Sequence, residues 1–196
     1  MIDYIKGTIV ELSPAELTLE CGGIGYSILI SLQTYQALQE KKEAKVYIFH
    51  YLREEVEEYF GFATKDEREL FELLISVSGI GVASARMMLS SLSSEEIRQA
   101  ILSEDVARIK SVKGIGVKSA QRLIIELKDK VVKGEGADSS ELFGGSARNE
   151  IVEEAFRALV MLGFAKPAVN KAIQTILKAN PNAKVEQIIK SALRMM

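Results

Sequence analysis

The sequence predicts an α+β multidomain protein with a small β-barrel, a helical domain, a flexible linker and a C-terminal three-helix domain. Short alternating apolar segments, separated by turn residues, fill the first part of the chain. Helical periodicity then takes over, and one short pattern within it occurs twice. A run rich in Gly and Ser separates these helices from a last helical group. The predicted domains cover residues 1–63, 64–133, 134–148 (the linker) and 149–196.

Composition limits the class of protein. The chain has 196 residues, 47% of them hydrophobic, which is enough for ordinary cores in one large or several small domains. Its apolar runs are too short to cross a bilayer, and residues 1–6 lack the pattern of a signal peptide. The single cysteine, Cys21, excludes an internal disulfide and fits a reducing compartment, so we expect a cytoplasmic protein without a membrane partner.

The first domain is predicted to be a barrel of the oligonucleotide-binding (OB) type. β-Branched residues, the turn at Ser13-Pro14 and the glycine cluster at residues 22–25 are typical of short strands joined by tight turns. A helical turn is expected over residues 34–40. The expected strands cover residues 2–12, 17–21, 26–32, 46–52 and 59–62. Five short strands in so short a segment favour a small closed barrel.

The last two strands of this domain enclose the most acidic stretch of the chain. It contains Glu54, Glu55, Glu57 and Glu58. The simplest interpretation is a solvated hairpin tip. His50, the only histidine, lies inside an apolar strand, so a packed or edge histidine is favoured over a catalytic one.

The second domain contains the repeated pattern. Residues 76–85 and 111–120 share Ser-Val-x-Gly-Ile-Gly-Val-x-Ser-Ala. Two glycines one residue apart allow a tight turn, and the apolar spacing that follows places its side chains on one helix face. Each copy therefore predicts a helix, a turn and a second helix. The free N–H groups at the start of that second helix, with the helix dipole, form a site for an anion such as phosphate.

The duplication decides between interpretations of this pattern. A single Gly-x-Gly would be a plain helical hairpin, and a dinucleotide-binding fold needs a strand before the glycines, where residues 70–77 have a helical pattern. Two such turns suit a polymer with regularly spaced phosphates. The pair resembles the helix-hairpin-helix motif of proteins that bind the DNA backbone without reading sequence. The expected phosphate-binding residues are Gly79, Gly81, Val82, Ala83 and Arg86, and Lys113, Gly114, Gly116, Val117, Lys118 and Arg122.

Charge is distributed unevenly along the chain. The net charge of −2 by itself argues against a general nucleic-acid binder. Residues 1–63, however, contain five basic and ten acidic residues. Residues 64–133 contain twelve basic and ten acidic residues. A basic cluster surrounds the second Gly-x-Gly turn, as expected for phosphate contact. It consists of Arg108, Lys110, Lys113, Lys118 and Arg122.

Helices are also predicted for the rest of the chain. In the second domain they end near residue 77, start at residues 82, 94 and 104, and cover residues 117–132. In the third, one starts at Asn149 and stops at Gly163, one has Pro167 near its start, and one contains Val185. A domain of this size suits docking rather than catalysis, and its turn resembles that of ubiquitin-associated (UBA-like) domains. The expected partner-binding residues are Leu159, Leu162, Gly163 and Phe164.

Taken together, the chain resembles the RuvA family of bacterial Holliday-junction branch-migration proteins over essentially its whole length. Residues 4–9, 21–26, 53–55 and 59–62 make the resemblance specific. It implies a homotetramer that holds a four-way DNA junction open and flat. It also implies a RuvB-type AAA+ ATPase, recruited by the C-terminal domain, and a junction-resolving nuclease as a further partner.

The resemblance also implies roles for single residues. Glu54 and Glu55 correspond to an acidic pin at the junction centre. No catalytic residue, cofactor or metal is expected in this chain, since the partner motor uses the ATP. One position departs from the family pattern, because Ala83 stands where a basic residue like Lys118 is expected, and Arg86 is the candidate to compensate.

Two other classes of function stay open at this point. A repair enzyme, either a glycosylase or a structure-specific nuclease, could use the same DNA contacts, but a nuclease needs clustered carboxylates in a cleft. The dense acidic cluster lies instead on a predicted hairpin tip. An RNA-binding or scaffold protein is the other alternative. The phosphate-binding pattern of ATPases, Gly-x-x-x-x-Gly-Lys-Ser/Thr, does not occur.

Overall fold

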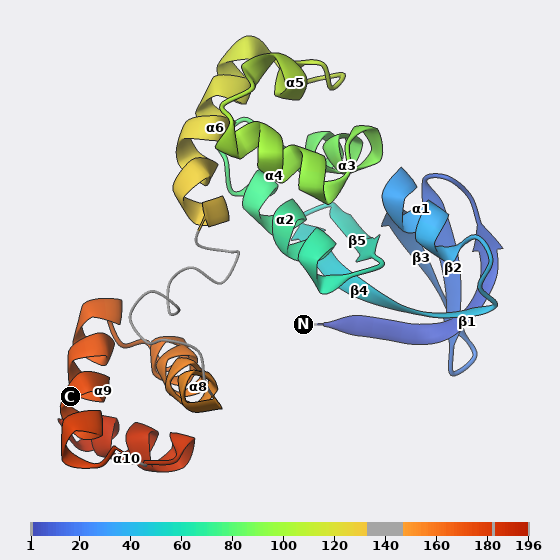
Figure 1. Cartoon of the computed structure of the whole chain (residues 1–196). Helices are drawn as coiled ribbons and strands as arrows, with labels where there is room; N and C mark the ends of the chain where they lie inside the picture. The colour runs from blue at the N-terminus through green and yellow to red at the C-terminus, as the bar shows by residue number, and fades with distance from the viewer. Residues whose placement is uncertain (1, 133–146, 182, 196) are drawn as a thin grey trace. The chain divides into compact units, whose positions relative to one another are not determined.

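A computed structural model describes residues 2–132, 147–181 and 183–195 (Figure 1). The chain forms two compact units, Met1–Val132 and Lys133–Met196. Most of the predicted linker lies outside the described residues. Its last two residues, 147 and 148, already belong to a helix.

A closed five-stranded barrel makes up the first part of unit 1. Its strands are β1 (Tyr4–Leu12), β2 (Glu16–Cys21), β3 (Ile24–Ile30), β4 (Glu43–Arg53) and β5 (Val56–Phe62). They close in the order β1-β2-β3-β5-β4, and only the β3–β5 pairing is parallel. The interior is tightly filled: a β-carbon on Gly61 would lie 2.5 Å from Ile28 and 2.7 Å from Val46 side-chain atoms, so this position needs glycine.

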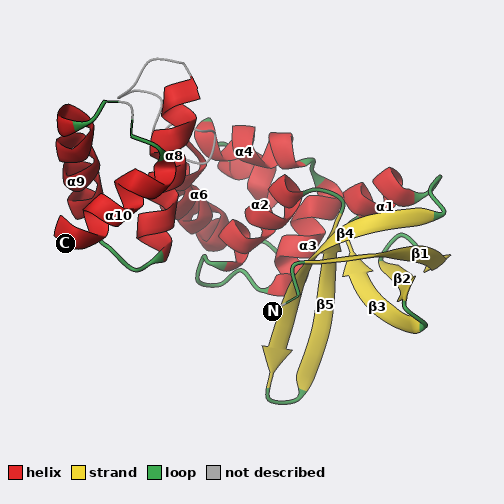
Figure 2. Cartoon of the chain, turned by 90° about the horizontal axis from the view of Figure 1, so that it is seen from below, coloured by secondary structure: helices red, strands yellow, loops and turns green. Residues whose placement is uncertain are grey.

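The hairpin between β4 and β5 is longer than the sequence analysis predicted. Both strands continue into the acidic stretch, so that Arg53 and Val56 are paired and only Glu54 and Glu55 form the turn. Glu57 and Glu58 are strand residues, because their extended backbone bonds to β4. Figure 2 shows this hairpin running out beyond the helices.

One short helix interrupts the strands. Helix α1 (Leu32–Leu38) begins after Ser31, whose Oγ accepts from the Thr34 amide at 3.0 Å. This cap ends β3 at Ile30, two residues before the predicted end of that strand.

Five helices follow the barrel in unit 1. They are α2 (Lys65–Ile75), α3 (Val82–Ser91), α4 (Ser94–Leu102), α5 (Val106–Lys110) and α6 (Val117–Val132). Ser93 and Glu96 form the reciprocal capping box at the start of α4. Helix α5 begins two residues later than predicted, because Glu104 has a φ of +56° and Asp105 is the cap.

The helices pack on one side of the barrel, through Phe60 and Phe62, while the barrel interior forms a core of its own. Phe71 of α2 packs on the barrel residues Phe60 and Phe62, with ring centroids 5.4 Å and 4.9 Å apart. A buried carboxylate, Glu67, lies in the same joint. It accepts from Ser31 Oγ at 2.5 Å, from Thr34 Oγ1 at 2.7 Å and from the Ala63 amide at 3.3 Å. Its burial raises the pKa of Glu67 above the usual range, against these hydrogen bonds.

Unit 2 contains helices α8 (Ala147–Met161), α9 (Lys166–Ala179) and α10 (Val185–Met195). They enclose a separate core, whose fully buried members are Ala155, Leu159, Val169, Ile188 and Ala192. Gly163, with a φ of +96°, follows α8, and Pro167 occupies the start of α9. Among the described residues of both units, no helix has the length and apolar character needed to span a membrane.

Candidate nucleic-acid interface

The two repeated turns have the same geometry. Gly79 and Gly114 have φ values of +92° and +90°, which favour glycine at both positions. In each turn the amide after this glycine donates to the carbonyl two residues before the glycine, at 3.0 Å in the first copy and 3.1 Å in the second. Each turn then leads directly into a helix, α3 or α6. The sequence repeat is therefore a structural repeat.

The turns are also neighbours in space. A β-carbon on Gly79 of the first turn would lie 3.8 Å from Ser119 Oγ, in the first turn of α6. Gly81 and Gly116 are exposed, and a β-carbon there would meet no atom within 4 Å. The first backbone amides of α3 and α6 have no partner within their own helices. The fold thus brings the starts of α3 and α6 close to each other.

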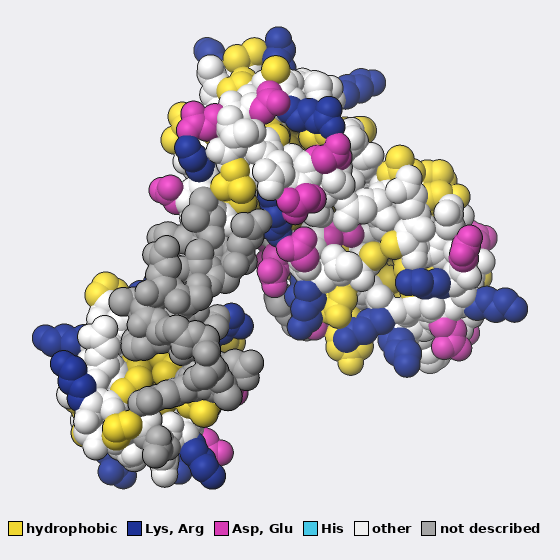
Figure 3. Space-filling model, viewed as in Figure 1, with side chains coloured by type: hydrophobic (Ala, Val, Ile, Leu, Met, Phe, Trp, Pro, Cys, Tyr) yellow, Lys and Arg dark blue, Asp and Glu magenta, His cyan; other side chains and the backbone are white. Residues whose placement is uncertain are grey.

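Positive charge belongs mainly to the second turn. Lys113 and Lys118 are exposed, and neither takes part in an ion pair among the described residues. Arg122 is exposed too, but its Nε contacts Glu126 Oε1 at 2.6 Å. Figure 3 shows Lys and Arg side chains gathered over α5 and the start of α6.

Arg86, the candidate to compensate for Ala83, is engaged with the barrel. It is partly buried, and its Nη1 donates to the Ala15 carbonyl at 3.2 Å. This hydrogen bond connects α3 to the turn between β1 and β2. Val82 is half-buried beside the first turn, whereas Val117 at the second turn is 43% exposed.

The acids of the β4–β5 hairpin fall into two groups. Glu54 and Glu55 are exposed at the tip. Glu57 instead contacts His50 Nε2 at 3.0 Å and accepts from the Tyr59 hydroxyl at 3.2 Å. His50 is partly buried and stacks on Tyr59, as expected for a packed or edge histidine. Burial raises the pKa of the Tyr59 hydroxyl, and its hydrogen bond to the Glu57 carboxylate raises it further.

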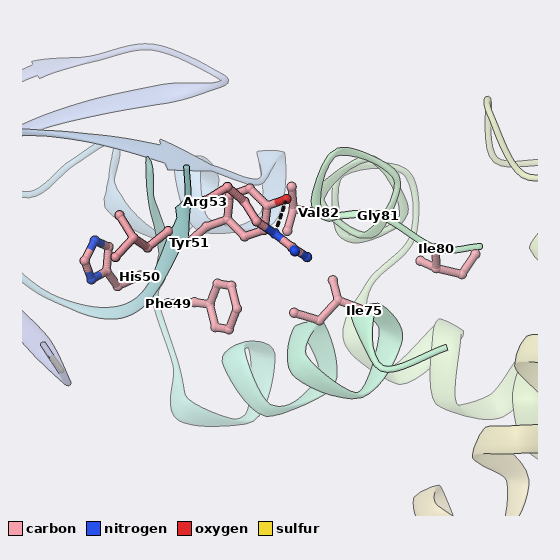
Figure 4. Close-up of a pocket in the computed structure, with 9 residues that line it drawn as sticks. Phe49, His50, Tyr51, Arg53, Ile75, Ile80, Gly81 and Val82 are labelled. Carbon is pink, nitrogen blue, oxygen red and sulfur yellow. Dashed lines mark hydrogen bonds between the residues drawn. The ribbon is translucent and has the colours of Figure 1, made fainter. Parts of the chain in front are cut away.

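A pocket separates this hairpin from the first Gly-x-Gly turn (Figure 4). Its volume is ≈ 310 Å³. Arg53, Tyr51 and Leu52 of β4 line one side, and Gly81 and Val82 line another. Neither Arg53 nor Tyr51 is among the site residues predicted from the sequence, because no local pattern relates a residue of β4 to the start of α3.

The predicted partner-binding residues of unit 2 differ in accessibility. Leu159 is fully buried in the unit's core, so it supports the fold and cannot itself contact a partner there. Leu162 is 59% exposed, Gly163 is exposed, and Phe164 packs partly on the core. Met161, 88% exposed at the end of α8, was not predicted, although its place beside Leu162 could have suggested it.

The described residues contain no group of three or more His, Cys, Asp or Glu side chains that could hold a metal ion.

Comparison with known proteins covers almost the whole chain. The family described as RuvA N terminal domain matches residues 1–61, the SAM-like helix-hairpin-helix tandem matches residues 71–129, and the RuvA C-terminal domain matches residues 150–196. These matches, with the five-stranded barrel and the helices, confirm the predicted fold class.

Several curated relatives are similar over their full length. The chain is 52% identical to a protein of Parabacteroides distasonis over 196 residues and 50% identical to one of Bacteroides fragilis over 203 residues, in each case covering 100% of both chains. A Flavobacterium psychrophilum protein is 45% identical over 99% of both chains. All three are named Holliday junction branch migration complex subunit RuvA. With such identity over its full length, the chain belongs to the RuvA family.

Proposed function

We propose that this chain is the DNA-binding subunit of a branch-migration complex, which recognises four-way (Holliday) junctions and holds them open and planar. The observation that carries the proposal is the full-length similarity to relatives named as subunits of such a complex. The chain itself is non-catalytic and needs no cofactor. It acts as a homotetramer and recruits and stimulates a RuvB-type hexameric ATPase.

The paired turns support the DNA-binding part of this proposal. Each helix start offers backbone amides and a positive dipole to a phosphate, which every DNA sequence presents. Lys113 and Lys118 add charge beside the second turn, where their side chains are open to solvent. Contacts of this kind position a duplex without reading its bases. Contacts that do not depend on the base sequence suit a protein past which the DNA moves during branch migration.

The acidic tip supports discrimination between junction and duplex. In a fourfold assembly the tips would meet near the centre, where Glu54 and Glu55 repel phosphates. In that assembly the carboxylates at the tips would be partly desolvated, and salt would screen them less than it screens fully exposed charges. A continuous duplex would have to pass over the acids, whereas the strands of a junction part at its centre. Specificity then arises from a penalty on the wrong substrate.

Unit 2 supports the recruitment of a motor. It has its own core, and Leu162 and Met161 stand exposed at the end of α8. Adjacent exposed apolar side chains on a small helical unit are suited to docking. The motor hydrolyses ATP, and this chain provides the surface on which the motor docks.

The salt dependence of binding tests the proposed DNA contacts. The chain should prefer a four-way junction over duplex DNA and over RNA of the same arm sequence, and its affinity should fall steeply with salt. Lys118→Ala should weaken binding and reduce the log–log salt slope by about one for each phosphate that is no longer neutralised. Lys42→Ala, which removes an exposed charge from the barrel, is the control. An unchanged slope in the double variant Lys118→Ala, Arg122→Ala would contradict the assignment.

A further inference from the structure

The first Gly-x-Gly turn lacks the cations of the second. At the three positions where the second copy has Lys113, Lys118 and Arg122, the first copy has Ser78, Ala83 and Met87. Arg86, the nearest basic residue in the chain, donates to the Ala15 carbonyl. The only charged side chain that the first motif itself could offer a phosphate is therefore Arg86, whose Nη1 already donates to the Ala15 carbonyl.

A cation from the barrel lies across the pocket from this turn. Figure 4 shows the Arg53 guanidinium extending from β4 toward Val82, at the start of α3. Arg53 and Gly81 line the same pocket of ≈ 310 Å³. Strand β4 of the barrel thus brings a guanidinium from outside the motif toward the start of α3.

The Arg53 side chain is held in this direction and keeps its charge available. Its Nε donates to the Tyr51 hydroxyl at 3.2 Å, and its guanidinium carbon lies 5.5 Å from the centroid of that ring. Although Glu54 and Glu55 follow it directly in the chain, Arg53 takes part in no ion pair among the described residues. The remaining guanidinium donors can therefore contact an anion.

We propose that Arg53 completes the first phosphate site, so that one DNA phosphate is bound by the α3 backbone amides and by a guanidinium from the barrel. This inference rests on the proposed function and assigns a specificity-determining residue to it. An arginine suits the position, since its planar group donates two hydrogen bonds to one phosphate. Tyr51 positions that group.

The site has a consequence for junction recognition. Arg53 is paired with Val56 at the end of the hairpin, and only Glu54 and Glu55 lie between them. The proposed phosphate-binding residue, Arg53, is thus directly followed in the chain by the acid Glu54, which would repel a phosphate. In the proposed complex, a DNA strand bound by Arg53 would lie close to the acids, and a junction strand could turn away from them whereas a duplex strand could not.

The inference is tested by the salt dependence of junction binding. Arg53→Gln should weaken binding roughly tenfold and lower the log–log salt slope by about one for the phosphate that it no longer neutralises. Arg53→Lys should restore the slope but only part of the affinity, and Tyr51→Phe should weaken binding with an unchanged slope. Lys42→Gln, just before the opposite end of β4, is the matched control. Far-ultraviolet circular dichroism checks that each variant is folded.

The outcomes separate this inference from the proposed function. If Arg53→Gln behaves like Lys42→Gln while Lys118→Ala lowers the slope, the inference is overturned and the proposed function stands. If the weakening disappears when Glu54→Gln and Glu55→Gln are also present, Arg53 only offsets those acids, and the inference is again overturned. A parent chain without preference for the junction would overturn the proposed function itself.

Discussion

At the scale of single residues, the acids of the β4–β5 hairpin differ in their surroundings. The turn consists of Glu54 and Glu55, both exposed, while Glu57 is engaged with His50 and Tyr59. The acids of the stretch are therefore not equivalent. Those at the tip have exposed side chains, and Glu57 belongs to a packed side-chain cluster on the strands.

Replacing the tip acids tests this at the residue scale. The double variant Glu54→Gln, Glu55→Gln keeps the shape of the turn and removes its charge. It should bind duplex DNA more tightly, keep its junction affinity and so lose discrimination. Competition binding at several salt concentrations measures the ratio of junction affinity to duplex affinity. A junction-to-duplex preference equal to that of the parent would leave the acids as a solvated tip only.

At the scale of elements, the joint between α1, α2 and the barrel fixes the hairpin relative to the paired turns. Glu67 of α2 accepts hydrogen bonds from Ser31 and Thr34, which begin α1, and from Ala63 after β5. One buried carboxylate thus links three segments of unit 1. Under the proposed function the joint matters for DNA binding, because Arg53 of β4 and Val82 of α3 line the same pocket.

The raised pKa of Glu67 gives this joint a pH dependence. Since the folded chain holds the proton more tightly than the unfolded chain, this group's contribution to stability is fully present below the ordinary value of 4.5 and is lost as pH rises through the raised pKa. Unfolding in urea, followed by tyrosine signals, should show the parent losing stability relative to Glu67→Gln over that window. All six tyrosines lie in unit 1, so they report on it alone.

Two further variants complete this test. Glu67→Ala should lower the free energy of unfolding at neutral pH by about 1–3 kcal/mol for each buried group that loses its partner. Glu69→Gln changes an exposed carboxyl on the same helix. If Glu69→Gln altered the pH dependence as much as Glu67→Gln does, the effect would not come from the buried joint.

At the scale of the whole molecule, the chain consists of two compact units. Each unit has its own hydrophobic core, and we expect each to keep its fold without the other. The paired turns and the acidic hairpin both belong to unit 1. The exposed apolar residues at the end of α8 belong to unit 2.

A chain ending at Gly136 should therefore keep junction binding and fail to stimulate the motor ATPase. Leu162→Ser in the full chain should reproduce the loss of stimulation without loss of helical signal, because Leu162 is exposed. Leu159→Ala should instead lower the stability of unit 2 by about 2–5 kcal/mol, because Leu159 fills its core. ATPase assays with the partner measure the first two effects. Full stimulation by the shortened chain would place the partner site in unit 1.

The sequence by itself determined the fold class, the order of the elements and the two repeated turns. These depend on local chemistry: a positive φ at Gly79 and Gly114 favours glycine, and caps such as Ser93 begin helices whatever surrounds them. Local patterns are visible in a single sequence because the interacting groups lie within a few residues of each other.

Only the tertiary structure decided which side chains act together. Packing of the barrel on the helices placed Glu67 against residues 33 and 36 positions away, tied Arg86 to the barrel, and turned Arg53 toward α3. It also set the two-residue turn of the hairpin and buried Leu159 while leaving Leu162 exposed. Such contacts depend on how distant segments pack, and neither periodicity nor spacing along the chain encodes the direction of a single side chain.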